Sequence, residues 1–192
     1  MNGVLVIDKP KGPTSHDVVS AVKRALRASK VGHLGTLDPL ATGVLPLVIN
    51  GATKFASLLS GNEKAYSAVM KLGETTDTYD SEGKVVKSSG YSDVTEEDVR
   101  KAMEGLCGRI RQTPPMFSAV KKNGIPLYKL ARKGIVVERE PKQVEISSMA
   151  DIRIYFPFVE FTVACSAGTY VRTICFDAGE ALGCGAHLTE LR

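Results

Sequence analysis

The spacing of hydrophobic residues near the N-terminus predicts a strand followed by a helix. A short apolar run at residues 4–7 leads into a turn rich in proline and glycine at residues 8–13, which is typical of a buried strand. Helical spacing follows as far as about Lys30, with Thr14 or Ser15 as the N-terminal cap. The apolar face of this predicted helix is formed by Val18, Val19, Val22 and Leu26.

Four further apolar runs predict the strands of a sheet. Two of them, at residues 44–49 and 64–72, are short and are bounded by turn residues. The two longest, at residues 144–155 and 158–165, alternate between apolar and polar positions and are separated only by Pro157. We therefore expect the last two to be neighbouring antiparallel strands.

Helical spacing returns at three places later in the chain. We expect a helix capped by Thr95, a short helix near residues 127–131, and a helix after Gly168 that continues through about Leu182. No internal repeat and no linker rich in proline, glycine or serine interrupts the pattern. The sequence thus predicts one mixed α/β (α+β) domain over residues 1–192 with a sizeable sheet.

Composition narrows the class of protein. With 192 residues and 43% hydrophobic content, the chain can form a proper core. No apolar run approaches the length of a membrane span, and the N-terminus lacks the pattern of a signal peptide, so we expect a cytoplasmic protein without a membrane partner. No spacing of cysteine and histidine suits zinc, so no metal is expected. Reduced and mostly buried thiols are expected at Cys107, Cys165, Cys175 and Cys184.

The distribution of charge favours a polyanionic partner. Lysine and arginine number 25 against 21 aspartate and glutamate, a formal net charge of +4. Basic residues cluster at residues 23–30, 121–122 and 129–133, where each cluster is either a solvated helix face or part of a nucleic-acid surface. Around residues 109–124 basic and apolar side chains are interleaved, a pattern that suits binding to the phosphates and exposed bases of RNA. An ordinary surface arm can have the same pattern.

One loop combines an acid with residues that make a rigid turn. Asp38 lies between Gly32 and Gly43 and is followed by Pro39, with His33 five residues before it. Such a loop can present a carboxylate rigidly, but an Asp-Pro turn is also ordinary turn chemistry. An enclosed carboxylate here would need a cationic partner from elsewhere in the chain.

Two other side chains are candidates for a site. Tyr66, near the start of a predicted strand, either packs half-buried or turns its flat ring toward a planar ligand. Arg172 lies in the first turn of the last predicted helix, beside a buried strand. It is therefore either a surface residue or one that reaches inward.

Several motifs together resemble a known family. They are Asp-Lys-Pro at residues 8–10, Gly-His-Leu-Gly-Thr-Leu-Asp-Pro-Leu-Ala-Thr-Gly at 32–43, Tyr66 with Leu-Gly at 72–73, and Gly-Thr-Tyr-Val-Arg-Thr at 168–173. They closely resemble the TruB family of tRNA pseudouridine synthases, along nearly the whole chain. The resemblance implies a pseudouridine synthase catalytic domain, with a central mixed, largely antiparallel sheet flanked by helices and RNA-binding loops. It also implies conversion of the uridine at position 55, in the TψC loop of tRNA, to pseudouridine.

The resemblance assigns roles to individual residues. Asp38 matches the catalytic aspartate, Tyr66 the tyrosine that stacks on the target base, and Arg172 the arginine that pairs with the aspartate. Other matching positions contact the substrate or line the uridine pocket, namely His33, Tyr170 and Leu191.

The resemblance also implies the partners of the chain. It points to a chain that binds the T-arm stem-loop of tRNA, flips the target base out of its stack, and uses no cofactor and no metal. We also expect the chain to be a monomer. Family members usually continue into a C-terminal PUA domain. Because the sequence stops at Arg192, we expect a shortened catalytic domain.

Two other functions remain open on the residues alone. An RNA-folding helper would have the same basic clusters, with Asp38 and Arg172 as a structural ion pair. A glycoside hydrolase also places a carboxylate near a sugar, but it normally requires two carboxylates, and the sequence offers no second acid near Asp38.

Overall fold

The computed structural model describes residues 1–192 and divides them into two units. The first comprises Met1–Asn62 together with Glu190–Arg192, and the second comprises Glu63–Thr189. Helices and antiparallel sheets occur together along the chain, which confirms the mixed α/β class. The prediction of one catalytic domain over residues 1–192 stays a prediction.

The first unit is a three-stranded sheet with a helix packed on one face. The strand order is β1-β3-β2, and both pairs are antiparallel. Its elements are β1 (Gly3–Lys9), α1 (Ser15–Ala25), β2 (Val31–His33), β3 (Gly43–Ile49), the 3-10 helix η1 (Asn50–Phe55) and α2 (Ala56–Leu59). The core between α1 and the sheet consists of Val18, Val19, Leu45 and Leu47, with Ile7, Val22, Val31 and Leu37 packed around them.

Helix α1 begins where the sequence predicts. The Thr14 hydroxyl accepts a hydrogen bond from the Asp17 N–H, and the Asp17 carboxylate accepts one from the Thr14 N–H. This capping box satisfies two of the N–H groups that a helix start leaves without intrahelical partners. The hydrogen bonds from Thr14 also lower the pKa of Asp17.

Helix α1 ends earlier than predicted, at Ala25 instead of near Lys30. Arg27 adopts a φ of 47°, and its N–H and the following one bond back to carbonyls of the last turn. This closure is the Schellman arrangement, with arginine at the position that glycine usually occupies. Leu26, predicted on the buried face, therefore lies at the helix end and is 41% exposed.

Strand β1 is buried on one face only, so the prediction of a buried strand is wrong for half of its residues. Val4 and Val6 are 52% and 61% exposed, whereas Ile7 packs toward the core under α1. Alternate residues of a strand point to opposite faces, and α1 covers only one of them.

The second unit contains a five-stranded sheet in the order β12-β4-β11-β10-β7. The pairing of β10 with β11 is antiparallel, as predicted, with Tyr155 opposite Phe158 at the turn. The sequence did not predict β2, the edge strands β7 and β12, or the two small hairpins β5-β6 and β8-β9. The strands are β4 (Glu63–Leu72), β5 (Glu74–Thr76), β6 (Val85–Ser88), β7 (Gly108–Gln112), β8 (Lys121–Lys122), β9 (Ile125–Pro126), β10 (Lys142–Tyr155), β11 (Phe158–Ser166) and β12 (Ala186–Leu191). Strand β12 begins in the second unit and ends in the first.

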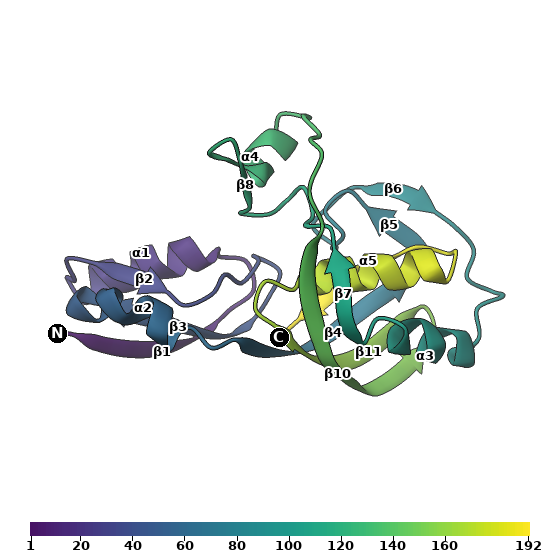
Figure 1. Ribbon diagram of the computed structural model, residues 1–192, viewed down its shortest axis with the longest axis horizontal. Coiled ribbons are helices and arrows are strands. Elements are labelled where there is room, and N and C mark those ends of the chain that lie inside the picture. Colours follow the sequence, from purple (N-terminus) through teal and green to yellow (C-terminus); the bar gives the residue numbers. More distant parts are fainter. The chain divides into compact units, whose positions relative to one another are not determined.

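Two helices of the second unit pack on its sheet. Helix α3 (Glu96–Glu104) contacts β10, and α5 (Val171–Ala181) contacts both α3 and β4 (Figure 1). Both helices lie where the sequence predicts them, and α3 starts with a capping box between Thr95 and Asp98. Gly179 lets α5 approach the start of β12, because a Cβ there would collide with the backbone that leads into this strand.

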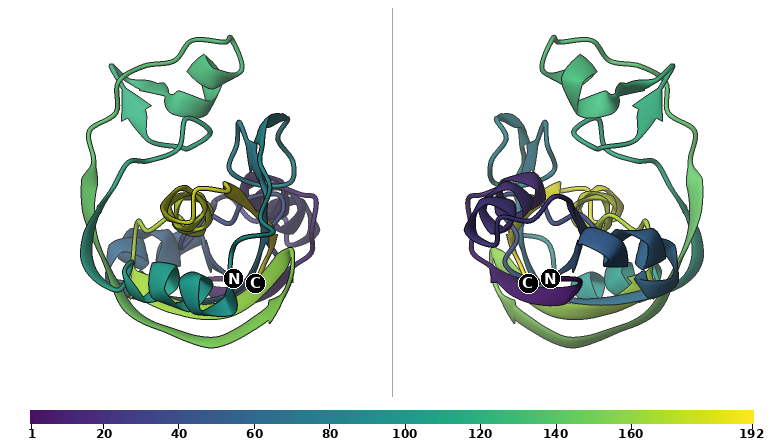
Figure 2. Two further views of the ribbon diagram at one scale, coloured as in Figure 1. Left: turned by 90° about the vertical axis from the view of Figure 1, so that its right-hand side faces the viewer. Right: turned by 90° about the vertical axis from the view of Figure 1, so that its left-hand side faces the viewer.

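A small basic arm, residues 121–134, stands away from the five-stranded sheet (Figures 1 and 2). It contains β8, β9 and the predicted short helix, α4 (Leu127–Ala131). The Arg132 guanidinium lies 5.5 Å from the centre of the Tyr128 ring. The lysine and arginine side chains exposed on the arm are Lys121, Lys122, Lys129, Arg132 and Lys133.

The four cysteines are free, as predicted. Cys165, Cys175 and Cys184 are buried and Cys107 is exposed. Burial raises the pKa of the Cys165 and Cys175 thiols, so both stay protonated at neutral pH. None of the helices has the length and apolar character needed to cross a membrane.

Candidate functional site

The predicted site residues lie in both units. The first unit carries His33, Asp38 and Leu191, and the second carries Tyr66, Tyr170 and Arg172. The two sets differ in how the surrounding chain holds them.

The turn that carries Asp38 is held at the residue before it by a buried serine. Ser15, the first residue of α1, donates its hydroxyl to the Leu37 carbonyl at 3.0 Å and accepts the Leu37 N–H at 2.9 Å. The Asp38 carbonyl accepts the Ala41 N–H at 3.0 Å, which closes the turn. The Asp38 side chain is half-buried.

The residues after Asp38 are held by a fully buried lysine. Lys9, the last residue of β1, donates from Nζ to the carbonyls of Pro10, Pro39 and Ala41 at 2.9, 3.3 and 2.7 Å. An ammonium group has three N–H donors, and carbonyl oxygens are suitable acceptors for them. Sequence reasoning placed this residue in the turn at residues 8–13 and missed its role, because the carbonyls of Pro39 and Ala41 lie about thirty residues away.

The other two predicted residues of the first unit border this loop. His33 ends β2, is half-buried, and bonds through Nδ1 to the Gly35 carbonyl. Leu191 is buried, and its carbonyl accepts the Thr42 N–H at 2.9 Å. The segment from His33 to Thr42 is therefore tied down at both of its ends.

Arg172 reaches inward and is buried within the second unit. It is the second residue of α5 and only 4% exposed. Its Nη1 lies 3.3 Å from Oδ2 of Asp80 and donates to the Thr78 carbonyl at 3.0 Å, and Nη2 donates to the Phe117 carbonyl at 2.9 Å. The guanidinium is thus paired and hydrogen-bonded, as a buried charge requires.

Asp80 is a buried acid that sequence reasoning missed. Its Oδ1 accepts from the Thr78 hydroxyl at 2.7 Å and from the Glu82 N–H at 3.0 Å, while Oδ2 faces Arg172. The sequence places it in a polar, turn-rich segment with other carboxylates, such as Asp77, and nothing in the local pattern distinguishes them. Asp80 differs from them because the folded chain brings Arg172 of α5 against its carboxylate.

Tyr79 shapes the turn that presents Asp80 to Arg172. Its φ of 64° is in the left-handed region, which few side chains adopt. The Tyr79 ring stacks on Phe176, with ring centres 4.0 Å apart, and Phe176 lies one turn after Arg172 on α5. This stacking stabilises the contact between the turn and the helix.

Tyr66 and Tyr170 are both half-buried. Tyr66 lies on β4, directly opposite Val163 of β11. Tyr170 immediately precedes α5, and its backbone bonds to the side chain of Gln112 through both its N–H and its carbonyl.

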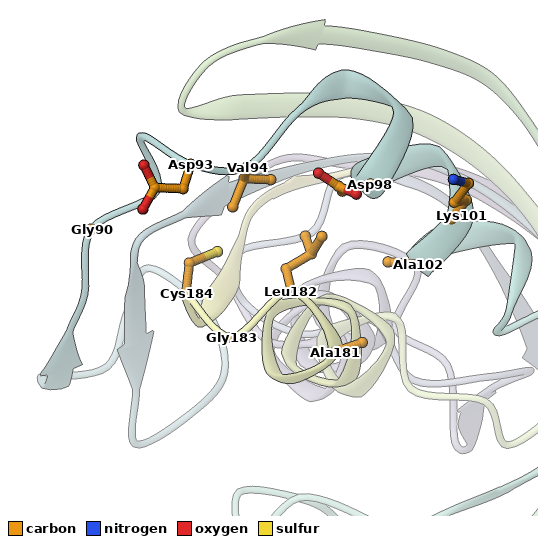
Figure 3. A pocket seen from close by; sticks show the side chains of 10 residues that line it. All are labelled: Gly90, Asp93, Val94, Asp98, Lys101, Ala102, Ala181, Leu182, Gly183 and Cys184. Carbon is orange, nitrogen blue, oxygen red and sulfur yellow. The ribbon is translucent and has the colours of Figure 1, made fainter.

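A pocket of about 580 Å³ lies elsewhere in the second unit (Figure 3). It lies between α3, with the segment before that helix, and the C-terminal end of α5, and its lining includes Asp93, Lys101 and Cys184. Arg172 lies near the other end of α5, about 14 Å away along a helix of this length. None of the predicted site residues lines this pocket.

The sequence matches the family described as TruB family pseudouridylate synthase (N terminal domain) over residues 23–171. The chain belongs to the TruB family. This confirms the resemblance, and the matched residues include the loop around Asp38 and end one residue before Arg172.

Two curated TruB relatives show how far the similarity extends. The chain is 52% identical to the tRNA pseudouridine synthase B of Geobacter sulfurreducens over 192 residues, all of this chain and 63% of the relative. It is 47% identical to the tRNA pseudouridine synthase B of Opitutus terrae, again along its whole length, and covers 80% of that protein. The chain thus spans less than two thirds of the Geobacter protein.

A solved structure confirms the predicted pseudouridine synthase fold. The crystal structure of a Cbf5-Nop10-Gar1 complex contains a chain that is 35% identical to this one, with a TM-score of 0.76. The match covers 99% of this chain and 47% of that one.

Proposed function

We propose that this chain is a tRNA pseudouridine synthase that isomerises the uridine at position 55 in the TψC loop. The observation that carries the proposal is membership of the TruB family. The relatives that are about 50% identical to this chain are named tRNA pseudouridine synthase B. The rigid mount of Asp38 and the buried, hydrogen-bonded Arg172 support it, because both are what the proposed chemistry requires.

The proposed reaction moves one bond and one proton. The bond from N1 of the base to C1′ of the ribose breaks, and a bond from C5 to the same C1′ forms. C5 then loses its proton and N1 gains one, so that the product is an isomer of the substrate. The Asp38 carboxylate either attacks the sugar or the base as a nucleophile or assists departure of the base, and both routes need it at a fixed place.

Arg172 is the proposed partner of the Asp38 carboxylate. A planar guanidinium suits two-point contact with a carboxylate, and it stays charged throughout the reaction. Asp80 and the two carbonyls on Arg172 hold the guanidinium in one orientation. Lysine would keep the charge but not this geometry, so we expect the Arg172→Lys variant to be strongly impaired.

The remaining residues are proposed to hold the substrate. The target base is stacked inside the TψC loop, and extruding it costs a few kcal/mol. Tyr66 and His33 would support the flipped arrangement, while Tyr170 and Leu191 would line the uridine pocket. The exposed basic side chains of α1 and of the basic arm are proposed to contact the phosphate backbone of the T-arm and so to offset that cost.

The test follows release of tritium from a T-arm stem-loop RNA that carries the label at C5 of its uridines. We expect the native chain to release tritium into water and the Asp38→Asn variant to release none, while RNA binding changes by less than about tenfold, since one carboxylate contributes little to holding a polyanion. Asp93→Asn, at an exposed acid, is the matched control and should keep full activity.

Each other outcome has a definite meaning. Binding without release by the native chain, on the stem-loop and on full-length tRNA, would favour an RNA-folding helper over an enzyme. Equal release by the native chain and Asp38→Asn would contradict the role of Asp38.

A further inference from the structure

Gln112 makes an unusual two-point contact with the backbone of Tyr170. Its Nε2 donates to the Tyr170 carbonyl at 3.1 Å, and its Oε1 accepts the Tyr170 N–H at 2.7 Å. Gln112 is only 2% exposed and is the last residue of β7, an edge strand of the five-stranded sheet. The contact joins residues 58 positions apart in the chain.

The primary amide suits this contact because it both donates and accepts. It therefore engages both polar groups of Tyr170, as a neighbouring strand would. Tyr170 is extended, with φ −102° and ψ 109°, and no side chain caps the helix that follows it. Gln112 takes the place of a cap by fixing the residue from which α5 starts.

The first turn of α5 depends on the same carbonyl. The Tyr170 oxygen accepts the N–H groups of Thr173 and Ile174 at 3.0 and 3.1 Å, in addition to the Gln112 amide. Arg172 lies within this turn. The orientation of the Tyr170 backbone therefore sets the direction of the Tyr170 side chain. It also sets the start of the helical turn that carries Arg172.

We propose that Gln112 is a positioning residue for the uridine isomerisation, acting through Tyr170 and the first turn of α5. This inference rests on the proposed function, which places Tyr170 against the uridine and Arg172 beside the reacting carboxylate. Gln112 itself contacts backbone only, so it acts on how the bound base is oriented and adds little to the binding of RNA.

Gln112→Met tests the inference, because it keeps the length of the side chain and removes both hydrogen-bonding groups. We expect kcat for tritium release from the labelled T-arm RNA to fall about ten- to a hundredfold, as expected for displaced reacting groups. KM should stay within about threefold, since the RNA-binding surface is untouched. Amide hydrogen exchange at Tyr170 should become faster than in the native chain, because its N–H loses its acceptor.

A stability control separates positioning from general weakening of the fold. Thr95→Ala removes the cap of α3, a feature outside the proposed site, and should lower Tm without changing kcat. If Gln112→Met fails to fold, Gln112→Glu replaces it, because it keeps the acceptor for the Tyr170 N–H and removes the donor for the carbonyl. Its kcat should also fall with little change in KM.

The outcomes distinguish this inference from the proposed function. No release by the native chain overturns the proposed function, and this inference with it. An active native chain with a Gln112→Met variant of equal kcat overturns the role of Gln112 alone. A kcat that falls as much in Thr95→Ala as in Gln112→Met overturns it as well, because the loss would then follow stability.

Discussion

The loop that carries Asp38 is held through its backbone, whereas Arg172 is held through its side chain. Ser15 and Lys9 bond to the peptide groups of Leu37, Pro39 and Ala41, on both sides of the acid. Around Arg172, by contrast, the contacts are made by the guanidinium itself, with Asp80 and two carbonyls.

The difference follows from what each group is proposed to do. A carboxylate that reacts with substrate needs a fixed mount and a side chain that substrate can reach, and Asp38 is half-buried on such a mount. A guanidinium that only orients a partner can be enclosed, provided that its charge is balanced. Substitution of Ser15 or Lys9 should therefore displace the loop that carries Asp38. Substitution of Arg172 or Asp80 should leave a buried charge without its partner.

The largest expected effect comes from Arg172→Met. It removes the cation that faces the buried Asp80 carboxylate, and breaking a buried pair from one side costs about 3–5 kcal/mol. The free energy of unfolding, measured in urea, should fall by that amount. In the double variant with Asp80→Asn the loss should be smaller than the sum of the two single losses, and simple additivity would contradict the pairing.

Lys9→Met should have the next largest effect. The variant keeps an apolar stem of similar size but leaves the carbonyls of Pro39 and Ala41 without their charged donor, which costs about 2–3 kcal/mol. Because the loop after Asp38 then loses its anchor, tritium release should fall as well. Lys11→Met, at an exposed lysine of the same turn, is the control, and a similar loss there would count against a specific role for Lys9.

Ser15→Ala should cost less, about 1–2 kcal/mol, because it removes a neutral hydroxyl that holds both polar groups of Leu37. Urea unfolding again measures the change. Ser29→Ala, which removes an exposed hydrogen bond to Asn50, should change stability by less than about 0.5 kcal/mol. If the two variants were equally stable, the hydroxyl of Ser15 would not be what holds the loop.

The smallest expected effect concerns Asp177, a partly buried acid of α5. Burial, with a smaller contribution from Glu180, raises the pKa of Asp177 to about 6. The folded chain therefore binds this proton more tightly than the unfolded chain does, and stability is lost as pH rises from about 4 to about 6. Asp177→Asn should raise Tm slightly at pH 7.

The pH dependence distinguishes this effect from a general gain in stability. The difference in Tm between Asp177→Asn and the native chain should shrink toward zero near pH 3, where the native side chain is largely protonated in both the folded and the unfolded state. An equal gain near pH 3 and at pH 7 would show that titration of Asp177 is not its cause.

Local signals made much of this fold predictable from sequence. The capping boxes of α1 and α3 each lie within four residues, and the β10-β11 hairpin joins neighbouring runs of alternating residues. Several short motifs, among them those around Asp38 and Arg172, together indicated the family, because each lies within a short stretch of the chain. The premature end of α1 was missed, since an arginine at a positive φ has no sequence signal comparable to glycine.

The tertiary structure alone decided which side chains support those motifs. The sequence by itself determined the family, the helices α1, α3, α4 and α5, the strands β1, β3, β4, β10 and β11, and the candidate reactive residues, because these depend on neighbours along the chain. Three contacts join residues from about thirty to more than ninety positions apart, and they bring Lys9 to the carbonyls after Asp38, Arg172 to the turn of Asp80, and Gln112 to Tyr170. Burial of each polar group is tolerable only with its partner in place, and that partner is present only once the chain has folded back on itself.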